Sequence, residues 1–326
     1  MKVCVFGAGA VGGHIATRMS AAGLADISVV ARGAHLDAIR KQGLTLKSGS
    51  SEIHAKPKVA TDDAATLPQQ DVVLVTLKAH ALPQLASTLE KLTAPQGTIV
   101  FMLNGLPWWW PYGRSDVKGP LRLLDPDGEL WTRLREKTLG CVIYSPNELE
   151  GPGVIVHHGG NRWVIGEPSD QATPRLRTIV DLFNKSGLPA EIPSDVRAEI
   201  WRKLMNNASG NSLAALTRLG HHAIASDPDL KQLGIRIMRE TLDVAAAVGS
   251  DLRSEIDVEK IAGRATPGPA PKPSMLQDVL FGRPLEVEAH LGQTQAFARE
   301  RKVPVPTIDL VLPLLRGLDR SIRAGQ

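Results

Sequence analysis

The sequence predicts an α/β domain with a parallel sheet, followed by an all-helical domain. Short apolar runs alternate with helical segments as far as residue 194, which is the pattern of successive βαβ units. From Asp195 onward the strand signal ends and only helical segments follow. The length of 326 residues also suits two domains better than one. We therefore expect one domain at 1–194 and a second at 195–326.

The strands expected in the first domain are continuous apolar runs, as is typical of parallel strands covered on both faces. Residues 71–77 (DVVLVTL) are a clear example. The stretch 107–130 is rich in proline, glycine and tryptophan, so we expect an irregular excursion there. The predicted strands are 2–6, 27–31, 71–77, 97–102, 139–144, 153–157, 162–165 and 190–192, and the predicted helices are 14–22, 34–42, 82–92 and 173–186.

The second domain is expected to consist of helices joined by loops. Residues 264–273 (RATPGPAPKP) contain four prolines and are predicted to be a loop. The predicted helices are 195–217, 228–248, 274–281, 284–301 and 307–323.

Composition excludes several classes of protein. The net charge is +4, and the basic residues are scattered among acidic ones, so we expect no nucleic-acid partner. No run of 18 apolar residues exists, so no membrane-spanning helix is predicted. Cys4 and Cys141 sit in apolar runs and are expected to be buried thiols, forming neither a disulfide nor a metal site. This cysteine usage suits a reducing compartment, and we expect a cytoplasmic protein.

A glycine motif follows the first strand directly. The segment Gly7-Ala8-Gly9-Ala10-Val11-Gly12 has the spacing GxGxxG and precedes a predicted helix. The first glycine allows a tight turn, the second lets the backbone approach a diphosphate, and the third lets helix and strand pack closely. The helix N-terminus then offers N–H donors to the anion. We expect this turn to bind a dinucleotide; the alternative is a glycine-rich turn without a ligand.

The end of the second strand indicates which dinucleotide binds. NAD-binding domains usually carry an acidic residue there to hold the ribose hydroxyls. Here the strand ends in Ala31-Arg32, and a guanidinium can bind a 2′-phosphate bidentately. Lys78, at the end of the third strand, could reach the same phosphate. We therefore expect NADPH rather than NADH, unless Arg32 is a solvated surface residue.

The segment 199–211 (EIWRKLMNNASGN) carries Lys203, Asn207 and Asn211 at spacings of four residues. On an α-helix these three side chains share one face. Reduction of a ketone needs this chemistry, because an ammonium can donate a proton to the oxygen that becomes an alkoxide. The amides could orient a polar substrate. Spacing alone leaves open that Lys203 is solvated and the asparagines pack between domains.

Several motifs, taken in order along the chain, resemble the ketopantoate reductase family. They are the glycine motif at 7–12, Leu77-Lys78-Ala79, Asn104-Gly105, WRKLMNNASGN at 201–211, Ser274-Met275-Leu276-Gln277-Asp278, Gly282-Arg283-Pro284, and Glu286. The resemblance covers almost the whole chain. It implies a Rossmann-like first domain and an all-α second domain of the 6-phosphogluconate dehydrogenase C-terminal type. It also implies NADPH-dependent reduction of 2-dehydropantoate (ketopantoate) to pantoate, with the substrate in the cleft between the domains.

The resemblance further implies roles for single residues. Lys203 matches the catalytic proton donor, and Glu286 matches an acid that orients the substrate and interacts with the lysine. Asn104 matches an asparagine near both the nicotinamide and the substrate. The remaining matches are substrate contacts at Asn207, Asn211 and Ser274, and 2′-phosphate contacts at Arg32 and Lys78. A homodimer through the helical domain is compatible with the family.

Three features depart from the family pattern and leave alternatives open. They are His290-Leu291 before Gly292, the excursion with Trp108-Trp109-Trp110, and Met205-Asn206. The tryptophans could narrow the cleft, or could be core or dimer contacts. Ser274 could simply cap a helix, and Glu286 could simply favour a helix dipole. The alternatives to ketopantoate reduction are the same chemistry on another 2-oxo acid, or a non-catalytic NADPH-binding regulator.

Overall fold

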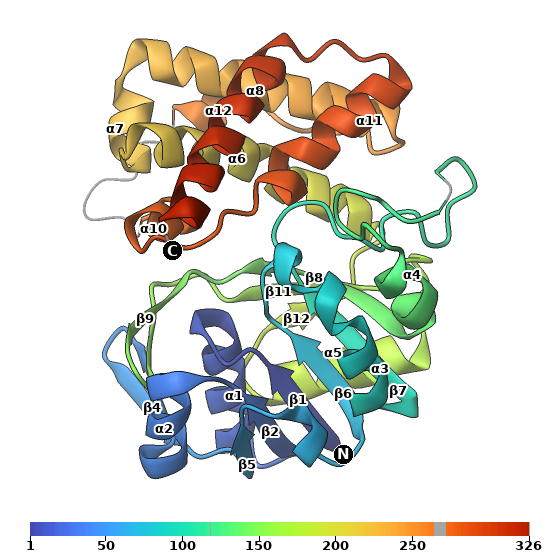
Figure 1. The fold of residues 1–326 in the computed structure, drawn as a ribbon, viewed down its shortest axis with the longest axis vertical. Coiled ribbons are helices and arrows are strands. Elements are labelled where there is room, and N and C mark those ends of the chain that lie inside the picture. Colours follow the sequence, from blue (N-terminus) through green and yellow to red (C-terminus); the bar gives the residue numbers. More distant parts are fainter. Residues whose placement is uncertain (118, 264–271, 326) are drawn as a thin grey trace. The chain divides into compact units, whose positions relative to one another are not determined.

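The computed structural model describes residues 1–117, 119–263 and 272–325, which form two compact units (Figure 1). The sheet unit comprises Met1–Leu103 and Trp108–Val196. The helical unit comprises Asn104–Pro107 and the chain from Arg197 onward. The short segment 104–107 therefore leaves the sheet unit and packs with Lys203 and Ala289 of the helical unit, far later in the sequence. Most of the loop predicted at 264–273 lies outside the described residues.

The sheet unit is built on a mainly parallel sheet of eight strands, of which β5 alone was not predicted from the sequence. Every neighbouring pair of strands is parallel except β8 and β11. In sheet order the strands are β12 (Ala190–Glu191), β11 (Arg162–Gly166), β8 (Thr138–Tyr144), β7 (Thr93–Met102), β6 (Gln70–Val75), β1 (Lys2–Phe6), β2 (Asp26–Val30) and β5 (Val59–Thr61).

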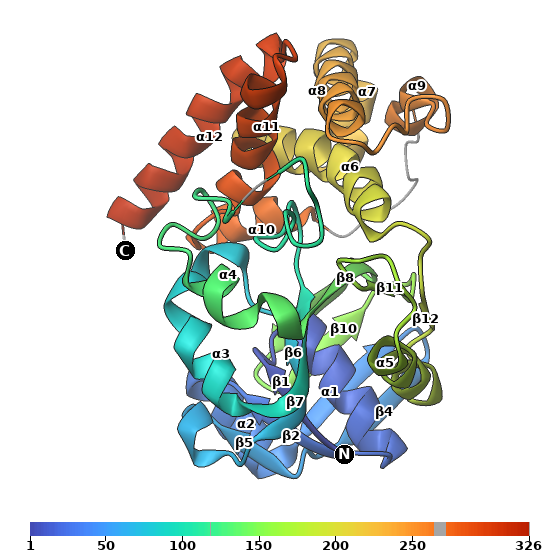
Figure 2. The same cartoon turned by 90° about the vertical axis from the view of Figure 1, so that its right-hand side faces the viewer.

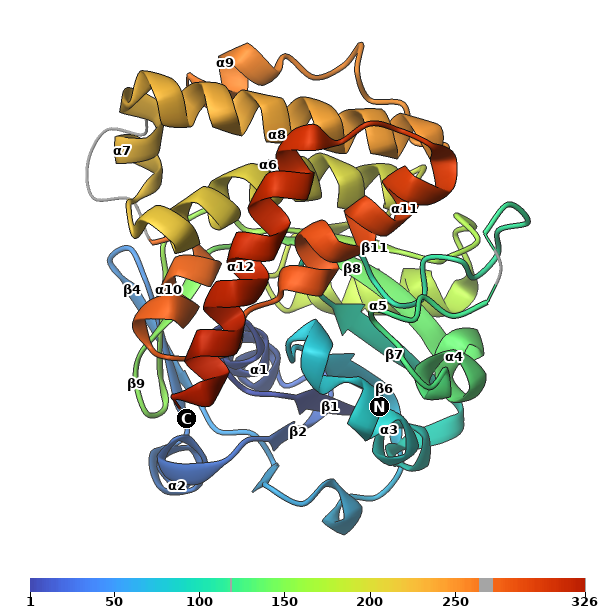
Figure 3. The same cartoon turned by 45° about the horizontal axis from the view of Figure 1, so that its top comes forward.

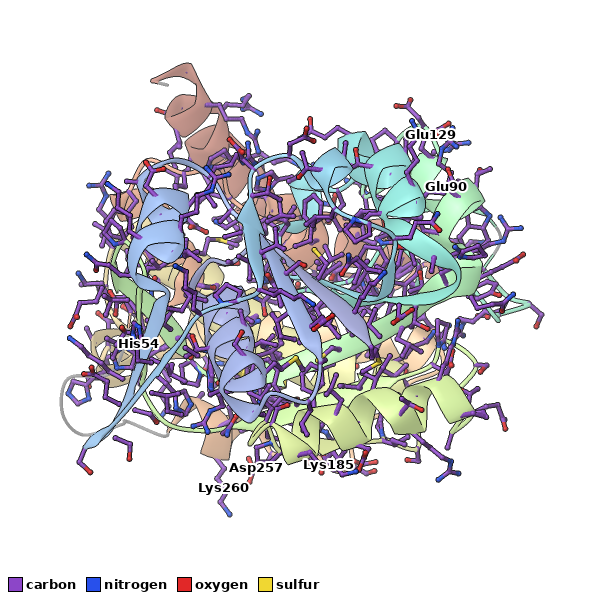
Figure 4. All side chains as sticks on the ribbon, turned by 90° about the horizontal axis from the view of Figure 1, so that it is seen from below. His54, Glu90, Glu129, Lys185, Asp257 and Lys260 are labelled. Carbon is purple, nitrogen blue, oxygen red and sulfur yellow. The ribbon has the colours of Figure 1, made fainter. Side chains whose placement is uncertain are left out.

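Helices cover both faces of this sheet, which explains the continuous apolar runs of its strands. Helices α1 (Ala10–Ala22), α2 (Gly33–Gln42) and α5 (Pro174–Lys185) share one apolar core with β1, where Val3 and Val5 are fully buried. Helix α3 (Ala86–Leu92) contacts β6 and β7, and Figure 2 shows it on the face opposite α5. Arg133 on α4 (Glu129–Leu134) pairs with Glu90 of α3 at 2.8 Å and with Glu129 at 2.6 Å. Figure 4 labels these two glutamates.

A second, four-stranded sheet was only partly predicted. Its order is β4 (Ser51–Ala55), β3 (Leu44–Ser48), β10 (Val154–His157) and β9 (Asn147–Gly151), and only β10 was expected. The pairing of β3 with β10 joins segments about a hundred residues apart, and no local pattern announces it. All four strands contact α1. Helix α1 packs closely on β10 at Gly13, where an added Cβ would lie 2.7 Å from Ile155 Cδ1.

The three adjacent tryptophans belong to the core of the sheet unit. The exposed fractions of Trp108, Trp109 and Trp110 are 1 %, 1 % and 0 %. The ring of Trp108 meets Phe101 of β7 edge to face at 5.2 Å. Trp109 packs on Gly140 of β8, where a Cβ would lie 2.2 Å from the indole ring. The excursion is irregular, as expected, and its tryptophans anchor it to the sheet rather than line an open surface.

The helical unit contains long helices and two short ones that the sequence pattern did not reveal. Helix α8 (Pro228–Ala247) contacts α7, α9, α11 and α12, and Figure 3 shows α12 crossing it. The short helices α7 and α9 have too few residues to show a helical period. The other elements are α6 (Val196–Thr217), α7 (His221–Ser226), α9 (Val258–Ala262), α10 (Ser274–Leu280), α11 (Gln293–Arg301) and α12 (Pro306–Ala324).

The helix predicted at 284–301 is shorter than expected and opens with a π-helical turn at Glu288–Gly292. Glu288 pairs with Arg316 of α12 through two contacts of 2.8 and 2.7 Å. A Cβ at Gly292 would collide with the Glu288 carboxylate, so the glycine makes room for this ion pair. Within the described part of the chain, no helix is both long and apolar enough to span a bilayer.

The contact between Gly140 and Trp109 yields a stability prediction. Gly140→Ala should lower the free energy of unfolding by about 1–3 kcal/mol, because the new methyl group overpacks the core. Urea unfolding followed by tryptophan fluorescence measures the change. Gly151→Ala is the matched control, since a Cβ there meets nothing within 4 Å and should change stability by less than about 0.5 kcal/mol. Equal stability of the two variants would contradict the packing described here.

Candidate active site

The glycine turn connects β1 to α1, and each glycine has a distinct steric reason. Gly7 has a φ of +104°, which residues with side chains rarely adopt. A Cβ at Gly12 would lie 2.2 Å from the carbonyl oxygen of Gly7, so only glycine allows α1 to start there. Above Gly9 the space is open, with the nearest atom, Leu149 Cδ1, at 4.0 Å. The turn therefore has one side on which a ligand can approach the backbone.

Hydrogen bonds hold the turn in place from three directions. The N–H groups of Gly7 and Ala8 both donate to the carbonyl oxygen of Val30, at 3.0 and 3.2 Å. The hydroxyl of Thr76 donates to the carbonyl oxygen of Gly7. The imidazole of His35 contacts the carbonyl oxygen of Ala8 at 2.6 Å. The conformation of the turn is therefore set by the ends of β2 and β6 and by the first turn of α2.

A cavity of about 270 Å³ opens beside this turn, where the carboxyl ends of β1, β2 and β6 meet. In an open α/β sheet this is where ligands bind, because β1 lies between strands whose connections run in opposite directions. Predicted residues lining the cavity are Gly7, Ala8, Gly9, Arg32 and Lys78, and His35 and Thr76 line it as well.

The cavity has the electrostatics of an anion site. Ala10, Val11 and Gly12 form the first turn of α1, which contains no acidic residue and supplies the positive end of the helix dipole. Arg32 is exposed at the start of α2, and no hydrogen bond or ion pair joins its guanidinium to any described residue. Among the lining residues no carboxylate is present. An open glycine turn, a helix N-terminus and two cations suit the diphosphate and an additional phosphate of a dinucleotide.

One buried histidine lies behind the turn without adding charge to it. His14 of α1 is fully buried, and burial lowers its pKa to about 3. Its Nδ1 is 2.8 Å from Asn147 Oδ1, while Arg18 Nε donates to its Nε2 at 3.1 Å. The neutral imidazole therefore links α1 to β9.

The helical unit contains the predicted proton donor and its partner. Lys203, on α6, donates from Nζ to Oδ1 of Asn104 at 2.7 Å. The segment that carries Asn104 is fixed to the residues preceding α11, since Leu106 N–H donates to the Ala289 carbonyl at 2.7 Å. Gly105 has a φ of +77°, and a Cβ there would lie 2.4 Å from the same carbonyl oxygen. Backbone contacts of the two residues after it therefore fix the position of Asn104, whose side-chain amide binds the Lys203 ammonium group.

Asn207 and Asn211 continue the same face of α6 towards its C-terminus. Asn211 is only 5 % exposed, and Asn207 is half-buried. Within residues 1–117, 119–263 and 272–325, neither amide has a hydrogen-bond partner. Buried amides are normally hydrogen-bonded, so these two are available to a polar ligand.

The structure places the last two predicted residues near the starts of helical segments. Ser274 is the first residue of α10 and is exposed, while Pro273 occupies the capping position, so Ser274 does not cap the helix. Glu286 precedes the π-helical turn, and its carbonyl oxygen accepts from the backbone N–H of His290 at 3.2 Å. Across the described ranges, no cluster of three or more His, Cys, Asp or Glu side chains could hold a metal ion.

His35 and Thr76 were not predicted as site residues from the sequence. Both contact carbonyl oxygens of the glycine turn, and the contacts span 27 and 69 residues of sequence. The only local signal for His35 was its place three residues after Arg32, in the first turn of a predicted helix. That signal does not reveal a partner so far away in the chain.

Comparison with known proteins covers the chain from end to end. Residues 3–170 match the family described as "Ketopantoate reductase PanE/ApbA", and residues 195–319 match its C-terminal part. A protein of Mesorhizobium japonicum named 2-dehydropantoate 2-reductase is 39 % identical over 325 residues, with 98 % of each chain covered.

Solved structures agree with these matches. A protein of Ralstonia solanacearum MolK2, solved as a candidate ketopantoate reductase, is 34 % identical with a TM-score of 0.86, and 98 % of each chain is covered. A PanE/ApbA family ketopantoate reductase of Ralstonia eutropha JMP134 is 25 % identical with a TM-score of 0.82, covering 99 % of this chain and 100 % of that one. The chain therefore belongs to the ketopantoate reductase family and is an oxidoreductase that acts on a ketone or CH–OH group.

Proposed function

We propose that this chain reduces ketopantoate (2-dehydropantoate) to pantoate with NADPH. The observation that carries the proposal is the Lys203 ammonium, held by Asn104 at 2.7 Å. The same helix face bears the side-chain amides of Asn207 and Asn211, which have no hydrogen-bond partner among the described residues. Family membership supports the reaction class, and the name of the Mesorhizobium relative supports the substrate.

The residues of the helical unit have the chemistry that this reduction requires. The bound cofactor supplies the hydride. As the carbonyl carbon gains that hydride, negative charge develops on its oxygen, and Lys203 Nζ is the donor that neutralises it. One proton passes from Nζ to oxygen, so the ketone becomes a secondary alcohol. Asn104 accepts from the ammonium and directs it, while Asn207 and Asn211 offer amide groups to the polar ends of the substrate.

We assign Ser274 to the substrate carboxylate and Glu286 to orientation of the substrate beside Lys203. These two roles rest on the family motifs. In the structure, Ser274 begins α10 and Glu286 precedes the π-helical turn.

The family consists of nicotinamide-dinucleotide-dependent oxidoreductases. For this chain we propose NADPH, because Arg32 and Lys78 line the cavity beside the glycine turn and no acidic residue does. A guanidinium and an ammonium favour the 2′-phosphate, whereas the ribose hydroxyls of NADH call for a carboxylate. We also propose a cytoplasmic location and a homodimer that forms through the helical domain. Leu310 and Leu314 are 73 % and 60 % exposed on α12, and the mass in solution tests the dimer.

Oxidation of NADPH, followed by absorbance with a panel of 2-oxo acids that includes ketopantoate, tests the proposed function. We expect kcat/KM for ketopantoate of roughly 10⁴ M⁻¹s⁻¹ or more, as for a committed enzyme. Efficient turnover of a different 2-oxo acid would show that the proposed substrate is wrong and the proposed type of reaction is right. Binding of NADPH without any turnover would favour a regulatory protein.

Lys203→Ala should lower kcat by about 10²–10⁴-fold, because it removes the proton donor, and should leave the Kd for NADPH nearly unchanged. Steady-state kinetics and a binding titration measure the two effects separately. Lys260→Ala is the matched control, since this exposed lysine lies on α9 of the same unit (Figure 4). Full turnover by the Lys203 variant would remove the lysine from the chemistry.

Arg32→Glu should weaken NADPH binding about 10- to 100-fold and affect NADH much less, because it loses a charged hydrogen bond to the 2′-phosphate. Titration with both cofactors gives the ratio of the two Kd values. Arg40→Glu makes the same charge change on α2, where Arg40 already bonds to the Ala60 carbonyl, and should leave the ratio unaltered. An unchanged ratio in the Arg32 variant would take Arg32 out of the cofactor site.

A further inference from the structure

His35 lies in the cavity beside the glycine turn, and both of its ring nitrogens have main-chain partners. The backbone N–H of Gly153 donates to Nδ1 at 3.0 Å. Because an amide N–H can only donate, Nδ1 must be the unprotonated nitrogen. The proton is therefore on Nε2, which donates to the carbonyl oxygen of Ala8 at 2.6 Å. The neutral imidazole is held in one tautomer and joins the glycine turn to the turn between β9 and β10.

The bond to Ala8 determines how the glycine turn presents its amides. A trans peptide unit is planar, so its C=O and N–H groups point in opposite directions. When His35 holds the Ala8 carbonyl, it also sets the direction of the Gly9 N–H. Gly9 is the glycine with open space above it, where an anion can approach. A carbonyl oxygen that rotated towards that space would instead repel a phosphate.

The other end of the link is rigid. Gly153 has a φ of +79°, and its carbonyl oxygen accepts from the Thr45 N–H at 2.9 Å, within the four-stranded sheet. A Cβ at Gly153 would lie 3.2 Å from Ala38 Cβ of α2, so the turn is pressed against the helix that carries His35. The second sheet therefore fixes the position of the Gly153 N–H that bonds to the imidazole.

We propose that His35 is a positioning residue that keeps the glycine turn in the conformation that receives the diphosphate of the cofactor. This inference rests on the proposed function, since it takes the anion to be a nicotinamide dinucleotide. The diphosphate is common to NADPH and NADH. His35 therefore contributes equally to the binding of both, in contrast to Arg32, which distinguishes them.

Binding of NADP⁺ and NAD⁺, measured by calorimetry without substrate, tests this role in three variants. His35→Phe keeps a ring but removes both hydrogen-bonding atoms, and it should raise both Kd values by the same factor, about 3- to 10-fold. His35→Gln keeps one donor and one acceptor and should stay within about twofold of the unmodified chain. His54→Phe is the matched control, because His54 is an exposed imidazole on β4 of the second sheet (Figure 4). Its Nδ1 contacts the Thr45 hydroxyl at 3.1 Å, and not the Thr45 N–H that bonds to Gly153. The His54→Phe variant should bind both cofactors normally.

Three results would overturn the proposal. The first is a His35→Phe variant whose Kd values for both dinucleotides are unchanged. The second is a His35→Phe variant that binds only NADP⁺ more weakly, which would make His35 a direct 2′-phosphate ligand. The third is a His35→Gln variant that binds as weakly as the Phe variant. If His35→Phe does not fold, as judged by thermal melting, His35→Ala is measured in its place with the same expectations. Failure of the unmodified chain to bind either dinucleotide would instead refute the proposed function. Normal binding by the Phe variant refutes only the role of His35.

Discussion

The first turn of α1 lies so close to the end of β1 that position 12 has room only for a hydrogen atom. A Cβ there would meet the Gly7 carbonyl oxygen at 2.2 Å. This closeness places the helix N-terminus at the sheet edge where β1, β2 and β6 end, and the cavity with Arg32 and Lys78 opens there. On its other side, α1 must also admit Ile155, which Gly13 allows. The positions of the anion site and of the second sheet both depend on how closely this one helix packs.

A similar steric constraint organises the helical unit. Asn104 and Lys203 are 99 residues apart, yet they share a hydrogen bond because the segment 104–107 packs with the helices. Gly105 makes this possible by letting the backbone lie against Ala289. The ammonium and the amide that holds it are thus assembled within one unit. The geometry of the proton donor is therefore set by a single packed core.

The second sheet supports the glycine turn and the helix that follows it. It buries one face of α1, contains the partner of His14, and supplies the Gly153 amide that fixes the tautomer of His35. A neutral histidine is well suited to such a link, because it offers one donor and one acceptor on opposite edges of a rigid ring. The glycine turn is held by the Val30 carbonyl at the end of β2, by the Thr76 hydroxyl, and by His35, which links it to the second sheet.

Features that depend on short stretches of the chain could be predicted from the sequence. Continuous apolar runs predicted β1, β2, β6, β7 and β8, glycine spacing located the turn, and the spacing of Lys203, Asn207 and Asn211 placed them on one helix face. The strands β3, β4, β5 and β9, the burial of Trp108–Trp110, the unit to which Asn104 belongs and the partners of His35 became known only from the folded structure. The reason is physical: each of these depends on contacts between segments far apart in the chain, and such contacts form only when distant surfaces fit together.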